Sequence, residues 1–198
     1  MIATKGRVSP GHRPKRRTER LWTFDELAAE VPETNQPMEL WDGALIMPPS
    51  PSYAHQTTAD RFHDLLKAWV RPRRLGRTAI APLDMVLSPH RATQPDVLFV
   101  ASARLEILTD RVRGAADLVA EVISPESRRR DRIDKRDLYE QHGIKEYWLI
   151  DPEAQTVEVL FLEREGYALV GRWRPGERAK SRLLKGFTVD VTQLFAND

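Results

Sequence analysis

The chain has 198 residues, 41% of them hydrophobic, with 31 Lys and Arg, 29 Asp and Glu, and no cysteine. This length and apolar content suit one domain with a real core, and they argue against a wholly disordered chain or a two-domain enzyme. The lack of cysteine excludes disulfide scaffolds and thiolate chemistry, and it favours a cytoplasmic location. No apolar run approaches the ~20 residues that span a bilayer, and no secretory signal is visible, so we expect a soluble protein without a membrane partner.

The net charge of +2 conceals a basic first segment. Residues 1–20 contain seven Lys or Arg and one Glu, so they carry +6 and leave −4 for the rest. Four Gly or Pro residues and few large apolar ones predict a mobile tail there. The tail could contact polyanions non-specifically, or it could be a poorly ordered leader or a mis-assigned start. We therefore expect a basic tail at residues 1–20 and a single domain at residues 21–198.

Local signals after the tail predict a short helix and then a β-hairpin. Thr23 can cap a helix over residues 24–29, which Pro32 ends. Asp42 and Gly43 form the dipeptide that best tolerates a type I′ turn. The two strands of the predicted hairpin are residues 38–41 and 44–47.

The following segments change from helical to extended spacing. The apolar side chains from His55 to Val70 fall on one side of a helical wheel, so we expect an amphipathic helix that Pro72 ends. A charged helix is expected at residues 129–142, with Gly143 after its end. The predicted strands are residues 78–87, 94–100, 117–123, 146–150, 156–162 and 167–173. This order indicates an α/β (α+β) fold, in which helices flank one mixed central sheet with an N-terminal hairpin and a C-terminal antiparallel extension.

Two carboxylates occupy unusual places in this pattern, whereas signatures of P-loop enzymes, α/β hydrolases and zincins are missing. Glu121 lies inside an otherwise apolar strand, where an ionised group is costly unless it is paired or binds a metal. Asp96 opens a similar run. Acids on adjacent strands could hold one Mg²⁺ or Mn²⁺, which would activate water and stabilise charge on a phosphoryl group. Alternatively, each acid faces solvent at a strand end or pairs with an arginine.

Lys135 supplies a positive charge near these strands. On a helical wheel it lies on the same side as the bulky Leu138 and Tyr139, so its ammonium is expected along the packed face. The competing interpretation is an i,i+4 ion pair with Asp131, which would stabilise the helix by only tenths of a kcal/mol, about 0.2–0.5. Spacing alone does not decide between these two interpretations.

Five stretches, in this order, resemble the Uma-two family of endonucleases, which has the restriction-endonuclease-like fold of the PD-(D/E)XK superfamily. They are residues 38–43 (MELWDG), 95–97 (PDV), 121–127 (EVISPES), the helix of residues 131–139 with Lys135, and residues 146–152 (EYWLIDP). The similarity runs from about Leu21 to about Phe195. It implies a metal-dependent phosphodiesterase site in which Asp96 is the Asp of the Pro-Asp motif and Glu121 is the Glu of the second motif.

The chain departs from the superfamily pattern at one position. The pattern has Lys two residues after the second acid, on the same face of the strand, and this chain has Ile123. Because a cation near the scissile phosphate orients water and offsets developing charge, its loss must be compensated. We take Lys135 as a migrated lysine. The second-rank candidates for the site are Glu39 in the hairpin, His55 and Asp84. A histidine in the position of His55 is more often a packed or capping residue. An outward-facing polar position explains Asp84 nearly as well.

The leading hypothesis is a Mg²⁺- or Mn²⁺-dependent DNA endonuclease. Its metal ligands would be Asp96, Glu121 and the Val122 carbonyl, and Lys135 would be the electrostatic partner of phosphate and water. A two-fold homodimer would suit cutting of both strands, although nothing in the sequence specifies an interface.

Two rival hypotheses remain. The first is a catalytically inactive nucleic-acid-binding or regulatory module, which the Ile123 departure and the acidic body favour. Its basic surface would come from a run of arginines, which more often forms a solvated face: Arg128, Arg129, Arg130, Arg132 and Arg136. The second is an interaction protein whose acids are structural.

Overall fold

The computed structural model of the chain describes residues 20–31 and 37–196. Apart from Arg20, the predicted basic tail at residues 1–20 therefore lies outside the described residues. The helices are α1 (Phe24–Glu30), α2 (Tyr53–Val70), α3 (Arg136–Gln141) and α4 (Val191–Leu194), with a 3₁₀ segment η1 (Ser102–Ile107) and a π-helical turn η2 (Arg130–Lys135). Within these residues, no helix has both the length and the apolar character needed to cross a membrane.

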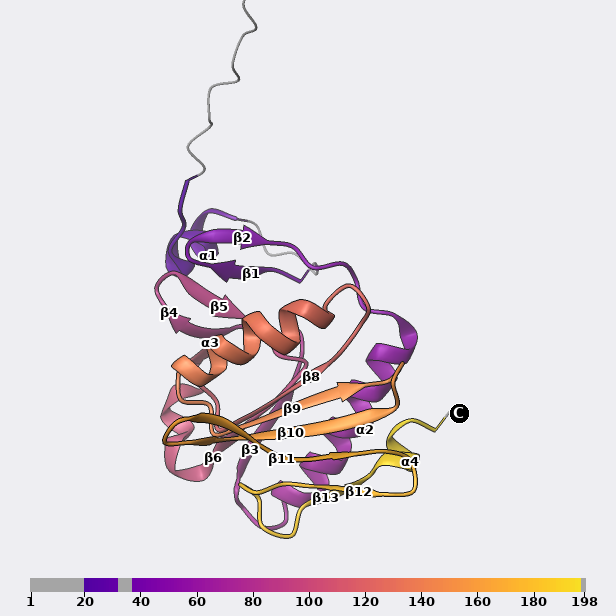
Figure 1. Ribbon diagram of the computed structural model, residues 1–198. Coiled ribbons are helices and arrows are strands. Elements are labelled where there is room, and N and C mark those ends of the chain that lie inside the picture. The colour runs from indigo at the N-terminus through magenta and orange to yellow at the C-terminus, as the bar shows by residue number, and fades with distance from the viewer. Residues whose placement is uncertain (1–19, 32–36, 197–198) are drawn as a thin grey trace, which may run out of the picture.

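The strands form three sheets, and the mixed α/β class predicted from the sequence is confirmed (Figure 1). The six-stranded central sheet has the order β11-β10-β9-β8-β6-β3, and only its β8–β9 pair is parallel. Its strands are β3 (Gly76–Ile80), β6 (Val97–Ala101), β8 (Leu118–Val122), β9 (Glu146–Asp151), β10 (Thr156–Glu163) and β11 (Gly166–Trp173). The predicted C-terminal antiparallel extension, β10 and β11, is thus one edge of this sheet.

The predicted hairpin belongs to a second sheet of five strands in the order β2-β1-β5-β4-β7. Its strands are β1 (Glu39–Trp41), β2 (Ala44–Ile46), β4 (Met85–Ser88), β5 (Arg91–Thr93) and β7 (Val112–Arg113). At the hairpin turn, Asp42 and Gly43 have φ of 50° and 81°, as a type I′ turn requires. The third sheet pairs β12 (Arg178–Lys180) with β13 (Thr188–Asp190).

One predicted strand is wrong in a way that matters for the architecture. Residues 78–87 do not form a single strand, because the chain leaves β3 at Ala81 and Pro82 and enters β4 in the other sheet. Proline has no N–H to donate to a strand ladder, so the interruption at this position has a direct cause. The prediction of one sheet is therefore replaced by a central sheet with a smaller sheet beside it.

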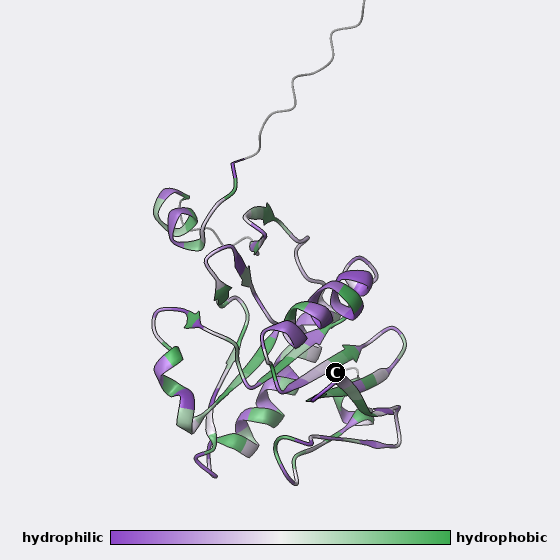
Figure 2. Cartoon of the chain, turned by 60° about the vertical axis from the view of Figure 1, so that its left-hand side comes forward, coloured by the Kyte–Doolittle hydropathy of each residue, from purple (hydrophilic) through white to green (hydrophobic). Residues whose placement is uncertain are grey.

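Helices α2 and α3 cover opposite faces of the central sheet (Figure 1). The packing of β8 follows the two-residue period of a strand. Leu118, Ala120 and Val122 join the core under α2, whereas Val119 and Ile123 join the core under α3. In Figure 2 the central strands are mostly hydrophobic, and hydrophilic residues gather on the helices and loops.

Local signals determine where the helices begin and end. Thr23 and Glu26 form a capping box on α1. The side chain of Ser52 caps α2, which therefore begins two residues before the predicted start at His55. After α3, Gly143 has a φ of 75°, a conformation that glycine adopts without strain. The charged helix predicted at residues 129–142 differs in form, since its first turn is π-helical.

Candidate functional site

A cleft of about 570 Å³ lies between β1, the first turn of α2, the adjoining ends of β6 and β8, and the turn η2. Five carboxylates line it: Glu39, Asp96, Glu121, Glu126 and Asp131. The bases that line it are His55, Arg130 and Lys135. The cleft thus brings together acidic groups from the central sheet and from the five-stranded sheet.

Glu121 lies on the α3 side of β8, because it shares the strand face of Val119 and Ile123. Its side chain is only 3% exposed. The oxygen Oε1 accepts hydrogen bonds from the Lys135 ammonium at 2.8 Å and from the Tyr139 hydroxyl at 2.5 Å. Both donors therefore hold the same oxygen of this buried carboxylate.

Lys135 lies among three carboxylates. Its Nζ is 2.8 Å from Oε1 of Glu121, 3.0 Å from Oε1 of Glu39 and 3.8 Å from Oδ1 of Asp131. The inward orientation expected from the wheel is observed, and the competing i,i+4 contact with Asp131 is the longest of the three. Tyr147 donates a hydrogen bond to the Asp131 carbonyl and so fixes the π-helical turn to the sheet.

Glu39 reaches the site from the smaller sheet. It is 2% exposed, and its Oε2 accepts a hydrogen bond from Trp41 Nε1 at 3.1 Å. Burial alone would raise the pKa of Glu39, but the charges of Lys135 and Arg130 outweigh burial and lower it. Glu39 is therefore held as a carboxylate against Lys135.

Asp96 lies where β6 begins, next to the end of β8. Its Oδ2 accepts a hydrogen bond from the Val122 amide at 2.7 Å and lies 3.2 Å from His55 Nε2. Burial lowers the pKa of His55, but the hydrogen bond and charge of Asp96 outweigh it, so that the pKa of His55 is raised. The other ring nitrogen, Nδ1, is buried and has no hydrogen-bond partner.

Burial raises the pKa values of two acids in the cleft, Glu121 and Asp131, whereas the neighbouring charges prevail at Lys135. Burial raises the pKa of Glu121 to about 8, because the opposing charge of Lys135 is shared with neighbouring acids. For Lys135, burial acts to lower the pKa, but the three carboxylates and Asp96 hold it well above its usual value. Burial also raises the pKa of Asp131. The lysine therefore stays charged while Glu121 takes up a proton near neutral pH.

The residues predicted for the site come together with one exception. The side chains of Asp96, Glu121, Lys135, Glu39 and His55 all line the cleft, as does Val122. Asp84 does not line it, and its carboxylate instead accepts a hydrogen bond from Gln94 and pairs with Arg111 at 3.0 Å.

Sequence reasoning did not assign Asp131 or Tyr139 a role in the site, and it named Arg130 only within the basic surface of the rival hypothesis. Arg130 and Asp131 line the cleft, and Tyr139 bonds to Glu121. The wheel placed Tyr139 beside Lys135, and this was the only signal available for it.

The arginines around η2 differ in their partners. Arg128 pairs with Asp151 and Glu153, and Arg132 pairs with Asp151 and Glu158. Arg129 is 80% exposed and lies 3.6 Å from Asp134. Two arginines of the basic run, Arg128 and Arg132, are therefore used in ion pairs with acids on and around β9 and β10.

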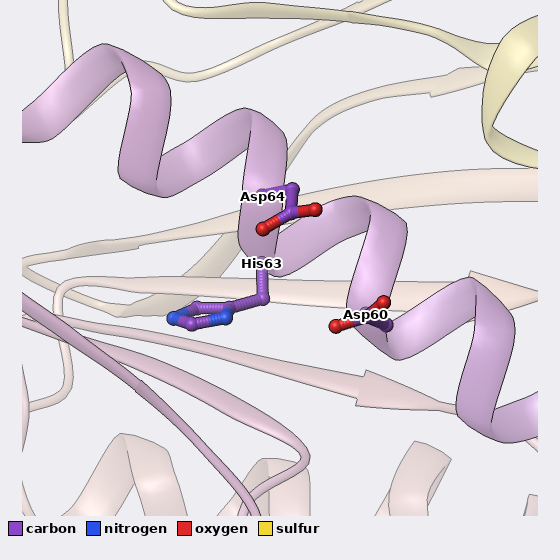
Figure 3. A group of neighbouring side chains, drawn as sticks. All are labelled: Asp60, His63 and Asp64. Atoms are coloured by element: carbon purple, nitrogen blue, oxygen red, sulfur yellow. The ribbon is translucent and has the colours of Figure 1, made fainter.

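A second group of potential ligands lies on α2, outside the cleft (Figure 3). One ligand atom from each of Asp60, His63 and Asp64 lies within 4.8 Å of the others. The His63 ring extends away from the helix, and its Nε2 is 3.1 Å from the Thr78 hydroxyl of β3. Both aspartates are exposed. This group is separate from the buried acids of the cleft.

A family model described as "Putative restriction endonuclease", Uma2, matches residues 23–192. The chain belongs to the Uma2 family. The resemblance to this family that the sequence suggested is thus confirmed, and the family description supports a nuclease function for the chain. No curated protein matches this Uma2 chain.

The solved structures give a likeness in fold. The chain is similar to a protein from Anabaena variabilis described as "a putative nuclease belonging to DUF820", with a TM-score of 0.73 and 23% sequence identity. The similarity covers 87% of this Uma2 chain and 97% of the Anabaena protein. It shows that the two proteins share their fold.

Proposed function

We propose that this Uma2 protein is a Mg²⁺- or Mn²⁺-dependent endonuclease that hydrolyses phosphodiester bonds in DNA. Asp96, Glu121 and the Val122 carbonyl would hold the metal, and Lys135 would act on the phosphate and the attacking water. One observation carries the proposal: the Lys135 ammonium lies 2.8 Å from Glu121 inside the cleft. It supplies the cation that the superfamily pattern has at the position of Ile123.

The donor atoms suit a hard divalent cation, since Mg²⁺ and Mn²⁺ prefer carboxylate and carbonyl oxygens. Among the described residues, neither Asp96 Oδ1 nor Glu121 Oε2 has a hydrogen-bond partner, because the donors around them contact the other oxygen of each carboxylate. One oxygen of each acid is therefore available. When bound, the cation would lower the pKa of a water and stabilise charge on the phosphoryl group.

The protein groups would support this chemistry in two ways. Lys135 is kept charged by its carboxylates, so its ammonium can offset charge that develops on the phosphate without prior proton uptake. Tyr139 and Lys135 fix Oε1 of Glu121, and the Val122 amide fixes Oδ2 of Asp96. Both acids are thus oriented by the fold before a ligand arrives.

We also propose, from the sequence, that residues 21–198 act as one domain, that the protein is cytoplasmic, and that a homodimer places two clefts on the two DNA strands. The single-domain proposal is supported by the contact of Lys135 with Glu39 of the smaller sheet and Glu121 of the central sheet.

The test is a plasmid-nicking assay with purified protein and Mn²⁺. Wild type is expected to nick the plasmid, whereas Asp96→Ala and Glu121→Ala are expected to lack activity. Asp64→Ala is the matched control, because it removes an acid that lies outside the cleft. Equal nicking by wild type and the double variant D96A/E121A would identify the activity as contamination. An inactive wild type would favour the nucleic-acid-binding or regulatory module.

A further inference from the structure

The cleft that would receive DNA has an excess of negative charge. Five carboxylates line it, against the two permanent cations Arg130 and Lys135. A divalent cation would offset part of this excess, but a DNA backbone also brings a negative charge at every phosphate. A cleft of this kind therefore needs a protein cation that is available to a phosphate.

Lys135 is poorly placed to serve a second phosphate. Its Nζ already contacts Glu121, Glu39 and Asp131, and its side chain is 4% exposed. The arginines on either side of Arg130 along the helix are also engaged. Arg128 and Arg132 share the buried Asp151, and Arg129 faces solvent.

Arg130 differs from all of these residues. Among the described residues its side chain has no ion pair within 4 Å and no hydrogen bond, and its Nε is buried without a partner. The side chain lines the cleft, and its charge helps to lower the pKa of Glu39, which places the guanidinium near the acidic centre. A buried, unpartnered donor of this kind is costly unless a ligand accepts its hydrogen bond.

We propose that Arg130 binds a backbone phosphate next to the scissile one and so positions the DNA strand in the cleft. This inference rests on the proposed function. A guanidinium can donate two parallel hydrogen bonds to phosphate oxygens, which gives direction as well as attraction. Arg130 is then a substrate-binding residue. The cleft acids and Lys135 would instead act at the metal and at the scissile phosphate.

The experiment compares Arg130→Ala, Arg130→Lys and the control Arg129→Ala in the full chain. Arg129 is the neighbouring residue, and its replacement changes the net charge equally but removes an exposed side chain. Two quantities are measured for each variant: kcat and KM for plasmid nicking with Mn²⁺, and DNA affinity by fluorescence anisotropy at several salt concentrations. The affinity is measured in the Glu121→Gln background, so that no cleavage occurs. Thermal melting of each variant checks that it is folded.

Arg130→Ala is expected to raise KM and weaken DNA binding about tenfold, with a smaller change in kcat. The slope of log affinity against log salt should fall by about one, as for the loss of one phosphate contact. Arg130→Lys should recover part of the affinity, and Arg129→Ala should resemble the parent protein. Arg130→Lys keeps the positive charge but removes the guanidinium. It can therefore replace Arg130→Ala in the comparison if thermal melting shows that the alanine variant is unstable.

Two results would overturn the inference while leaving the proposed function intact. In the first, wild type nicks DNA but Arg130→Ala keeps its KM, affinity and salt slope. In the second, Arg130→Ala lowers kcat alone, which would mean that the guanidinium acts only through the neighbouring acids. A wild type that neither binds nor nicks DNA would remove the proposed function and the inference together.

Discussion

The Lys135 ammonium donates a hydrogen bond of 2.8 Å to Oε1 of Glu121, although the two residues are 14 positions apart and belong to a π-helical turn and a strand. The strand face of Glu121 and the inward side of the helix meet beneath α3. In this arrangement a lysine from the helix reaches Glu121, which we propose as the second acid of the superfamily pattern.

Replacing Lys135 by Met tests whether this ammonium serves the reaction. Loss of a preorganised cation at such a position should reduce kcat by about 10²–10³-fold. It should also destabilise the fold by roughly 3–5 kcal/mol, because Glu121 and Glu39 would lose their buried partner. Nicking kinetics and urea denaturation measure the two effects separately.

A lysine introduced at position 123 should compensate in part. Ile123 faces the same core as Val119 under α3, on the strand face of Glu121. The double variant I123K/K135M is therefore expected to nick DNA faster than K135M alone. If the double variant is folded by circular dichroism and is no faster, Lys135 does not replace the strand lysine.

Removal of the Tyr139 hydroxyl should deprive Glu121 of one hydrogen bond without creating a cavity in the core. Tyr139→Phe keeps the ring but deletes the 2.5 Å hydrogen bond, so we expect a loss of about 1–2 kcal/mol in unfolding free energy. The same bond favours the ionised carboxylate, so its loss should raise the pKa of Glu121 further and shift the pH dependence of nicking to higher pH. Tyr53→Phe is the control, since Tyr53 is 79% exposed, and it should change neither quantity.

The raised pKa of Glu121 predicts how Mn²⁺ affinity changes with pH. With a pKa of about 8, Glu121 is mostly protonated at pH 7, and metal binding must displace that proton. Affinity in wild type should therefore rise between pH 7 and pH 9. Titration calorimetry in buffers of different ionisation enthalpy should detect the released proton. A constant affinity over this range would contradict the protonated state of Glu121.

The same shift has a consequence for stability. The folded-state pKa of Glu121 lies above its unfolded value, so its contribution is fully present below about pH 4.5 and is lost as pH rises through about 8. In metal-free protein this group alone would lower the unfolding free energy by at most about 1.4 kcal/mol per pH unit in that interval. Glu121→Gln should remove this dependence, as measured by urea denaturation at a series of pH values.

A different buried acid, Glu146, provides a structural comparison. Its carboxylate accepts hydrogen bonds from Trp148 Nε1 and from the Ser181 hydroxyl, and from the amides of Arg182 and Leu183. Glu146→Gln replaces one accepting oxygen by a donor and should cost roughly 1–3 kcal/mol in unfolding free energy. Nicking by the folded variant should be unchanged, because Glu146 does not line the cleft. A selective loss of activity would show that the core and the site are coupled.

The sequence was informative where a residue conflicts with the period of its own element. Glu121 is a charged residue in an otherwise apolar strand, and the helical wheel predicted that Lys135 faces inward. Both features can be read from the local sequence. In the structure the two side chains are in contact. The hairpin turn and the glycine after α3 were equally local signals. The fold class could therefore be predicted from the hydrophobic periodicity and from the residues that form turns.

The rest depended on tertiary structure. No periodicity indicates that Glu39 crosses from the smaller sheet to meet Lys135, or that the turn from Arg130 to Lys135 is π-helical. Asp84 resembled Glu121 in its apolar neighbours, yet its contact with Arg111 depends on a long-range approach of the chain. The break of residues 78–87 into β3 and β4 had a local sign in Pro82, which the alternation of the flanking residues concealed.

Anomalous diffraction from Mn²⁺-soaked crystals would locate a bound ion in the cleft without relying on activity. We expect a strong peak in the cleft between the carboxylates of Asp96 and Glu121, and the absence of that peak in Asp96→Ala crystals. A peak only at Asp60, His63 and Asp64 on α2, or none at either place at millimolar Mn²⁺, would contradict this expectation.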